Sequence, residues 1–320
     1  MSEQISSQGM QWSGQSVTIA ICTWNRAELL AQTLNHLREL RIPEGLRWEV
    51  LVVDNNSTDR TRETVETLRS ALPLRYVFEP KPGISHARNR ALREAASSFL
   101  LFTDDDVLVD PGWMVAALET WRRFPDATMV GGPIEPWFPS PVDPDMAAAF
   151  PVFANGFCGL DHGPVERALS PGSDLYTANL AIQPRMLGQM SFDESLGHTG
   201  KELVGGEDLD FVRRIHRRGD LVAWSPAMRV RHYVDPRRMT LAYVKRFYFD
   251  DARCRVRMNG VPGKARIVGA PLWLWRQVVA TYLRFCIARV TSSRRRSLLA
   301  LRDHMVTRGM FVEACASVRS

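Results

Sequence analysis

Short apolar runs alternate with helical patterns from residue 16 to residue 134, and this alternation restricts the fold more than any other feature. Apolar runs with the length of buried strands lie at 16–24, 47–56, 74–79 and 98–103, and the first is rich in β-branched residues. Segments with apolar residues at helical spacing lie between them, at 27–40, 57–72 and 84–96. Strands that alternate with helices of this length form β-α-β units, so we predict an α/β fold with a mainly parallel central sheet flanked by helices.

The rest of the chain is less regular at first and then helical. Pro133–Pro171 is rich in Pro, Gly and aromatic residues, and we expect loops with little regular structure there. Extended patterns follow at 173–184 and 221–234, and helical patterns follow at 205–219, 239–257 and 271–310. The N-terminal residues lack the apolar core of a signal peptide, and no uncharged apolar run reaches the roughly 20 residues of a membrane span.

The charge of the chain is divided unevenly. The total net charge is +6, but residues 1–235 carry −8 and residues 236–320 carry +14. Because a chain that only binds nucleic acid rarely has a strongly acidic larger part, we expect no nucleic-acid partner. Five scattered cysteines without a C-x-x-C pair are typical of reduced thiols, which predicts a cytoplasmic protein.

Polar residues follow three of the predicted strands, at the ends where parallel sheets bind ligands. They are Thr23 to Arg26, Asp54 to Asn56, and Asp104 to Asp106. Three consecutive aspartates repel one another unless a positive group lies among them. A Mg²⁺ or Mn²⁺ ion would remove this repulsion and would also bind a substrate diphosphate. The alternative is a solvated acidic turn before a helix that opens at Asp110-Pro111.

The order of several motifs resembles that of the family 2 glycosyltransferases with the GT-A fold. The motifs are VTIAICTWNRAELLAQTL, VLVVDNNSTDRT, KPGISHARNRAL, LLFTDDDVLVDPGW, TANLAI, FDESLG and GGEDLDFVRRIHRRG, and they span roughly 17–234. The resemblance implies a metal-dependent, inverting enzyme that moves a sugar from a nucleotide-diphosphate donor to an acceptor hydroxyl. The Q-x-x-R-W motif and the membrane spans of the processive synthases are absent from the sequence, so we expect one sugar per transfer.

The resemblance also suggests a division of the chain. It implies a flexible tail at 1–15 and a GT-A catalytic domain at 16–235. Within this domain, the nucleotide-sugar half lies at about 16–132 and the acceptor half at about 133–235. The remaining residues, 236–320, are expected to form a helical basic region. We expect the acceptor to be chosen by Pro133–Pro171 and by this C-terminal region.

Several residues match the family's donor-binding positions: Thr23, Arg26, Asp54, Arg88, Asn89, Asp104 and Asp105. By resemblance, Thr23 and Arg26 border the nucleotide base, and Asp54 hydrogen-bonds a uracil ring, which favours a UDP-sugar. Arg88 and Asn89 lie in the element near the base and the diphosphate. A solvated helix position is the alternative for Arg88.

The aspartate triplet matches the family's D-x-D region. Asp106 is the first candidate for a metal ligand, and Asp104 faces the ribose or the metal. Asp105 could take either role. His232 matches a histidine that follows the last core strand in many relatives, where it binds the metal or contacts the diphosphate. An ordinary surface histidine is the alternative.

The catalytic candidate is Asp208, in GGEDLDF. An inverting transfer requires a base that deprotonates the attacking hydroxyl, and a carboxylate can do this. Glu207 is assigned by resemblance to the acceptor side. Asp210 lies two residues on and would point elsewhere on a helix. The alternative is that these acids only favour the positive end of a helix.

The basic C-terminal region permits two interpretations. A basic, aromatic-rich helical segment can lie on an anionic membrane surface, and residues 239–310 form such a segment. If they bind a membrane, we expect a lipid-linked glycan acceptor. Alternatively, the helices pack on the catalytic domain and their arginines are solvated or pair with acidic residues. The enzyme would then be cytoplasmic, or peripheral on the inner face of the cell membrane and active in envelope polysaccharide synthesis.

Two other functions are compatible with parts of the sequence. A sugar-nucleotide nucleotidyltransferase also uses a Rossmann-like sheet and a carboxylate-bound metal, but CTWNRAE is not the Gly-rich loop that such enzymes have. A non-catalytic protein that binds polyanions or membranes on a degenerate GT-A scaffold is the second alternative. The retention of Asp54, Asp106 and Asp208 together argues against it.

Overall fold

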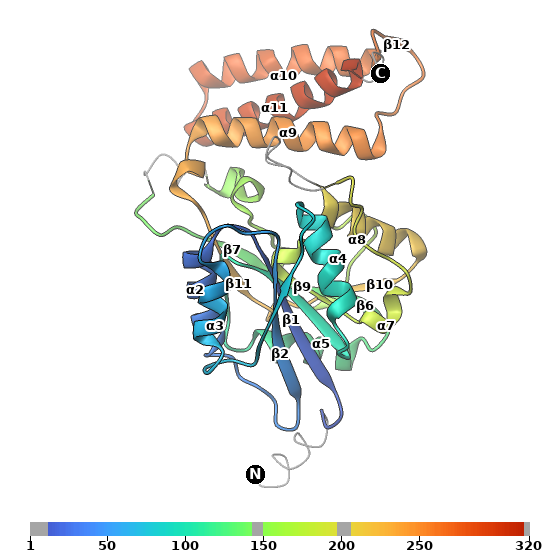
Figure 1. Cartoon of the computed structure of the whole chain (residues 1–320). Coiled ribbons are helices and arrows are strands. Elements are labelled where there is room, and N and C mark those ends of the chain that lie inside the picture. The colour runs from blue at the N-terminus through green and yellow to red at the C-terminus, as the bar shows by residue number, and fades with distance from the viewer. Residues whose placement is uncertain (1–11, 143–149, 197–205, 317–320) are drawn as a thin grey trace. The chain divides into compact units, whose positions relative to one another are not determined.

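A computed structural model describes residues 12–142, 150–196 and 206–316 (Figure 1). The chain divides into two compact units. The first holds the described residues of Met1–Trp137, Gly159–Gly197 and Glu207–Tyr233, and the second holds those of Phe138–Cys158, His198–Gly206 and Val234–Ser320. Most of the predicted tail at 1–15 lies outside the described residues. The segment 138–158, expected in the acceptor half, belongs to the second unit.

The first unit is built on an eight-stranded sheet with the order β3-β2-β1-β4-β9-β6-β10-β8. Its strands are β1 Ser16–Thr23, β2 Arg47–Asp54, β3 Leu74–Phe78, β4 Phe99–Asp104, β6 Ala127–Gly131, β8 Arg167–Ala168, β9 Leu180–Ile182 and β10 Leu221–Trp224. Strands β3, β2, β1 and β4 are parallel neighbours, and β6 is parallel to β10. Only β9 and the edge strand β8 run against their neighbours, so the predicted mainly parallel sheet is confirmed.

Helices cover both faces of this sheet (Figure 1). They are α2 Ala27–Leu37, α3 Thr61–Leu68, α4 Ile84–Glu94, α5 Trp113–Arg123, α7 Pro184–Leu187 and α8 Glu207–Arg218. Alternate residues of β1 point to opposite faces: Ile19 and Ile21 belong to one buried cluster, with α2, α3 and α5, whereas Ala20 and Cys22 belong to another, with α4 and α8. The sheet is therefore the middle of three layers, as its near-continuous apolar strands predict.

A second, three-stranded sheet with the order β5-β11-β7 differs from the sequence-based expectations. Strand β5 Val107–Val109 follows the aspartates directly, and β7 Ile134–Trp137 lies in a segment expected to be loops. The third strand is β11 Val230–Tyr233. The helix expected at Pro111 begins instead at Trp113, because the Asp110 carboxylate accepts the backbone N–H of Gly112 at 2.8 Å and closes a turn before it.

The second unit is mainly helical, as predicted. Its described elements are the 3₁₀ helices Phe150–Val152, Ala154–Phe157 and Pro236–Arg238, the helices α9 Leu241–Asn259, α10 Leu272–Thr291 and α11 Arg294–Ala316, and the hairpin β12 Arg266–Ile267 with β13 Ala270–Pro271. Helix α11 packs against both α9 and α10 (Figure 1). The helical stretch expected at 271–310 is broken at Ser292, whose backbone is extended. No helix among the described residues has the length and apolar character needed to cross a membrane.

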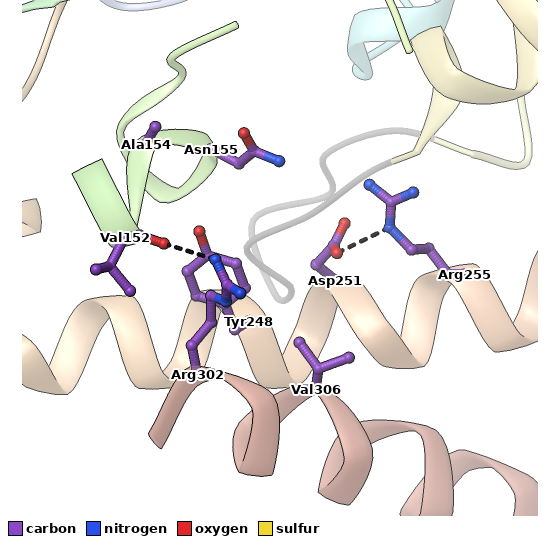
Figure 2. A pocket seen from close by; sticks show the side chains of 8 residues that line it. All are labelled: Val152, Ala154, Asn155, Tyr248, Asp251, Arg255, Arg302 and Val306. Atoms are coloured by element: carbon purple, nitrogen blue, oxygen red, sulfur yellow. Dashed lines mark hydrogen bonds and ion pairs between the residues drawn. The ribbon is translucent and has the colours of Figure 1, made fainter. Parts of the chain in front are cut away.

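A pocket of about 350 Å³ lies within the second unit (Figure 2). Its lining residues are Val152, Ala154, Asn155, Tyr248, Asp251, Arg255, Arg302 and Val306. The Arg302 guanidinium donates to the Val152 carbonyl at 3.1 Å and so ties α11 to the segment before Ala154. The pocket thus joins parts of the two segments in which the sequence predicts acceptor selection, and that role stays a prediction.

Asn179 is a buried hub of the first unit and supplies a stability test. Its amide donates to the carbonyls of Pro133 and Met228 at 3.0 and 2.7 Å, and its side-chain oxygen accepts the indole N–H of Trp113 at 2.7 Å. We predict that Asn179→Ala lowers the free energy of unfolding by about 3 kcal/mol, because buried polar groups lose their partners. Urea unfolding measures this. Asn35→Ala, which removes only an exposed bond within α2, is the control, and equal losses in both variants would contradict the hub.

Candidate active site

The polar ends of three neighbouring strands meet at one edge of the large sheet. Thr23, the last residue of β1, is in register with Asp54, the last residue of β2. On the other side of β1, Cys22 is in register with Asp104, the last residue of β4. Because the three strands are parallel, their carboxyl ends lie side by side, as expected for a ligand-binding edge.

Asp105 turns toward the loop after β1. Its carboxylate accepts the Thr23 hydroxyl at 2.7 Å and lies 3.1 Å from an Arg26 guanidinium nitrogen. The same nitrogen of Arg26 lies 2.7 Å from Asp106, and the Thr33 hydroxyl donates to the Asp105 carbonyl at 2.9 Å. Arg26 therefore supplies part of the positive charge that the aspartate triplet requires.

Asp104, Asp106 and His232 form a group with the geometry of a metal site. One ligand atom from each lies within 4.8 Å of the others. His232 Nε2 is 3.4 Å from Asp106 and 3.7 Å from Asp104, and its Nδ1 lies 2.9 Å from the Tyr233 carbonyl, which orients the ring. Among the described residues nothing donates a hydrogen bond to the buried Asp106 Oδ1. Two carboxylates and an imidazole, with Asp106 Oδ1 facing His232 Nε2 and bonded to no described donor, fit a divalent cation.

The pairing of β11 with β5 explains why His232 reaches the aspartates. His232 is in register with Val107, the residue directly after the triplet, and the Tyr233 N–H donates to the Asp106 carbonyl at 2.9 Å. The small sheet therefore joins two residues more than 120 positions apart in the sequence.

Arg88 links this group to the first turn of α8. The buried guanidinium lies 2.5 Å from Glu207 and 4.0 Å from Asp104. Arg88 is thus a buried, paired residue and not a solvated helix charge. The second oxygen of Glu207 is buried and accepts no hydrogen bond from a described residue. Asp210 points elsewhere and pairs with Arg214 at 2.7 Å, as its position on the helix predicts.

The environment of each carboxyl determines its proton affinity. Burial, with the charge of Glu207, raises the pKa of Asp208 to about 7, against the opposing effect of Arg88. Burial and the charge of Asp106 raise the pKa of Asp105 to about 7. Burial also acts to raise the pKa of Asp104, but His232 and Arg88 outweigh it and hold this pKa below its ordinary value.

Asp54 and Asn89, which are both expected to bind the donor, make hydrogen bonds within the protein. The Asp54 carboxylate accepts the Tyr76 hydroxyl at 2.7 Å and the backbone N–H of Ser57 at 2.9 Å. Asn89 donates to the Phe192 carbonyl and accepts the Phe192 N–H, at 2.9 and 2.8 Å. Their donor contacts stay predictions. Tyr76 is not among the residues predicted from the sequence, although it lies two residues before the end of β3, the strand that pairs with β2 beside Asp54.

Comparison with known proteins shows the family to which the chain belongs. The family model for glycosyl transferase family 2 matches residues 18–140. The chain is 33% identical over 254 residues to the succinoglycan biosynthesis protein ExoM of Rhizobium meliloti, covering 76% of this chain and 74% of that protein. The chain belongs to glycosyl transferase family 2. This glycosyltransferase is also 29% identical over 226 residues to validoxylamine A glucosyltransferase of Streptomyces hygroscopicus, covering 63% of this chain and 48% of that protein.

Solved structures support the same fold for this glycosyltransferase. The mannosyltransferase PcManGT of Pyrobaculum calidifontis, solved with GDP-Man and Mn²⁺, has a TM-score of 0.59 and 20% identity, covering 98% of this chain and 92% of that one. S. aureus TarS 1-349, solved with UDP, has a TM-score of 0.54 and 18% identity, covering 95% and 91%. The fold is GT-A, as the motifs predicted.

The raised pKa of Asp208 leads to a pH-dependent stability. Its folded-state pKa of about 7 exceeds the unfolded value of about 4, so the folded protein binds the extra proton and loses stability as the pH rises between these values. We predict that Asp208→Asn makes the metal-free protein more stable than wild type at pH 8, and that the difference disappears at pH 4. Urea unfolding in EDTA measures this.

Asp210→Asn is the matched control for this measurement. It removes an acid from the same helix but breaks the contact with Arg214, so no gain is expected at pH 8. A stability difference for Asp208→Asn that does not change with pH would show that the pKa of Asp208 is the same in the folded and the unfolded protein.

Proposed function

We propose that this protein is a metal-dependent, inverting glycosyltransferase that moves one sugar from a nucleotide-diphosphate donor to a hydroxyl of a glycan or lipid-linked acceptor. A UDP-sugar is the first candidate donor. The observation that carries the proposal is the position of Arg88, which lies between the Asp104–Asp106–His232 group and the acids at the start of α8. In this proposal a diphosphate-binding centre and a candidate base are adjacent parts of one site.

The acids of α8 would act on the acceptor. In this proposal Asp208 takes the proton of the acceptor hydroxyl as that oxygen attacks the anomeric carbon from the side opposite the leaving diphosphate. Its raised pKa, near neutrality, suits a base that must accept a proton during the reaction. The unbonded oxygen of Glu207 could accept a hydrogen bond from an acceptor hydroxyl, while Arg88 fixes its other oxygen.

The donor diphosphate would lie at the aspartate end of β4. Asp104, Asp106 and His232 would hold Mn²⁺ or Mg²⁺, and the bound ion offsets the negative charge that develops on the leaving diphosphate. Arg26 and Arg88 add fixed positive charge beside it. The imidazole in this donor set favours Mn²⁺, because Mg²⁺ prefers oxygen ligands.

The comparisons support this assignment in general terms. The solved structures include complexes with UDP, UDP-GlcNAc, and GDP-Man with Mn²⁺, and the relative named for succinoglycan biosynthesis acts in making a polysaccharide. Because the chain belongs to family 2, nothing supports the two alternative functions, a sugar-nucleotide nucleotidyltransferase and a non-catalytic binding protein. The cytoplasmic location stays an expectation from the cysteines.

Donor binding tests the metal-binding part of the proposal. We expect UDP to bind wild type in the presence of Mn²⁺ and not in EDTA, and we expect Asp106→Ala to lose this metal-dependent binding, because a ligand is removed. Isothermal titration calorimetry measures it, with GDP and dTDP as competing donor classes. Glu135→Ala, which removes an exposed carboxylate paired with Arg229, is the control. A folded wild type that binds no nucleotide would overturn the proposal.

The role of Asp208 can be separated from donor binding. We expect Asp208→Asn to keep the metal-dependent nucleotide affinity of wild type and to lower kcat by about 10²–10⁴-fold, the usual contribution of a general base. Asp210→Asn should keep most of the activity, because its carboxylate pairs with Arg214. Transfer by Asp208→Asn at the wild-type rate would assign the base to another residue.

A further inference from the structure

We propose that the outer face of α10, together with the turn between β12 and β13, docks on an anionic lipid surface. This inference concerns the second unit and does not depend on the donor or the metal. Many large apolar side chains of α10 are exposed: Leu272, Trp273, Trp275, Val279, Tyr282, Leu283, Ile287 and Val290. Val290 is 87% exposed and Ile287 is 61% exposed. Contiguous exposure of this kind marks an interaction surface.

Helix α10 has a buried stripe and an exposed apolar stripe on opposite sides. Leu274 and Thr281 are buried, and the Thr281 hydroxyl lies 3.3 Å from His304 Nδ1 of α11, so this side packs on the neighbouring helix. The outward stripe consists of Leu272, Val279, Leu283 and Val290. At about 100° per residue these four positions lie within about 40° of one another, roughly opposite the buried pair. Packing in the second unit therefore uses only one of the two stripes.

The turn between β12 and β13 extends the exposed apolar surface. Ile267 and Val268 are both more than half exposed. The indole N–H of Trp275 donates to the Ile267 carbonyl at 3.1 Å, and that of Trp273 donates to the Pro262 carbonyl at 2.8 Å, so the first turn of α10 fixes this turn. Val268 has a φ of +48°, which costs energy for a β-branched residue. The turn therefore adds two exposed apolar side chains, Ile267 and Val268, to the apolar surface of α10.

The charge of this region indicates which partner binds the exposed face of α10. Residues 252–302 contain no Asp or Glu but twelve Lys and Arg, of which four pair with carboxylates outside this range: Arg253, Arg255, Arg257 and Arg302. Arg276, Arg284 and Arg289 are exposed on α10, and the described part of the chain gives them no carboxylate partner. A second copy of the chain would bring like charges together, whereas anionic headgroups complement the arginines. Apolar side chains flanked by arginines are the pattern of a helix that lies in the membrane interface.

Vesicle flotation of the full-length protein tests the proposal. We expect the protein to float with vesicles of phosphatidylcholine and phosphatidylglycerol at low salt, to float less as the salt rises, and not to float with phosphatidylcholine alone. Leu283→Glu places an acid in the outward stripe and should weaken partitioning by about tenfold. Leu241→Glu makes the same change at an exposed leucine of α9 and should keep wild-type binding.

Three outcomes would overturn the proposal. The first is no flotation with phosphatidylglycerol vesicles at low salt by protein that unfolds cooperatively. The second is equal loss of binding in Leu283→Glu and Leu241→Glu, which would show that net charge alone is sensed. The third is a concentration-dependent dimer in sedimentation velocity that Leu283→Glu dissociates, which would assign the face to a second copy.

Discussion

The charge balance at the carboxyl end of β4 is the constraint on which the rest of the site depends. Five carboxylates gather there from two distant segments, 104–106 and 207–208. Arg26, Arg88 and His232 come from three further elements and lie between them. Removing one partner of a buried ion pair leaves an uncompensated charge, which is strongly destabilising. The loss of any one of these three cations would therefore leave a buried carboxylate without its partner.

The fold of the first unit could be predicted because its signals are local. Strand length, β-branched content and helical spacing are read within about a dozen residues. The order of the strands' polar ends then predicted which segments would meet, and Thr23, Asp54 and Asp104 do end neighbouring strands. The small sheet could not be predicted in this way, because β5 and β7 have only three and four residues. Their pairing with β11 depends on contacts between distant segments.

For a related reason, the sequence could not predict the direction in which each aspartate side chain points. Consecutive residues in a turn point in different directions, and those directions depend on the strand that follows. Here β5 and its partner β11 place Asp106 and His232 together and leave Asp105 facing Thr23 and Arg26. Likewise, the motif that contains Arg88 and Asn89 predicted that both matter, but not that Asn89 holds the backbone of Phe192.

The chain passes from one unit to the other close to two candidate site residues, His232 and Glu207. His232 lies two positions before the crossing at Tyr233–Val234, and Glu207 is the first residue after the crossing at Gly206. The strand paired with β11 ends at Trp137, where a third crossing begins. A substitution at either of the first two boundaries therefore changes the backbone directly beside a candidate metal ligand or a candidate acceptor-side acid.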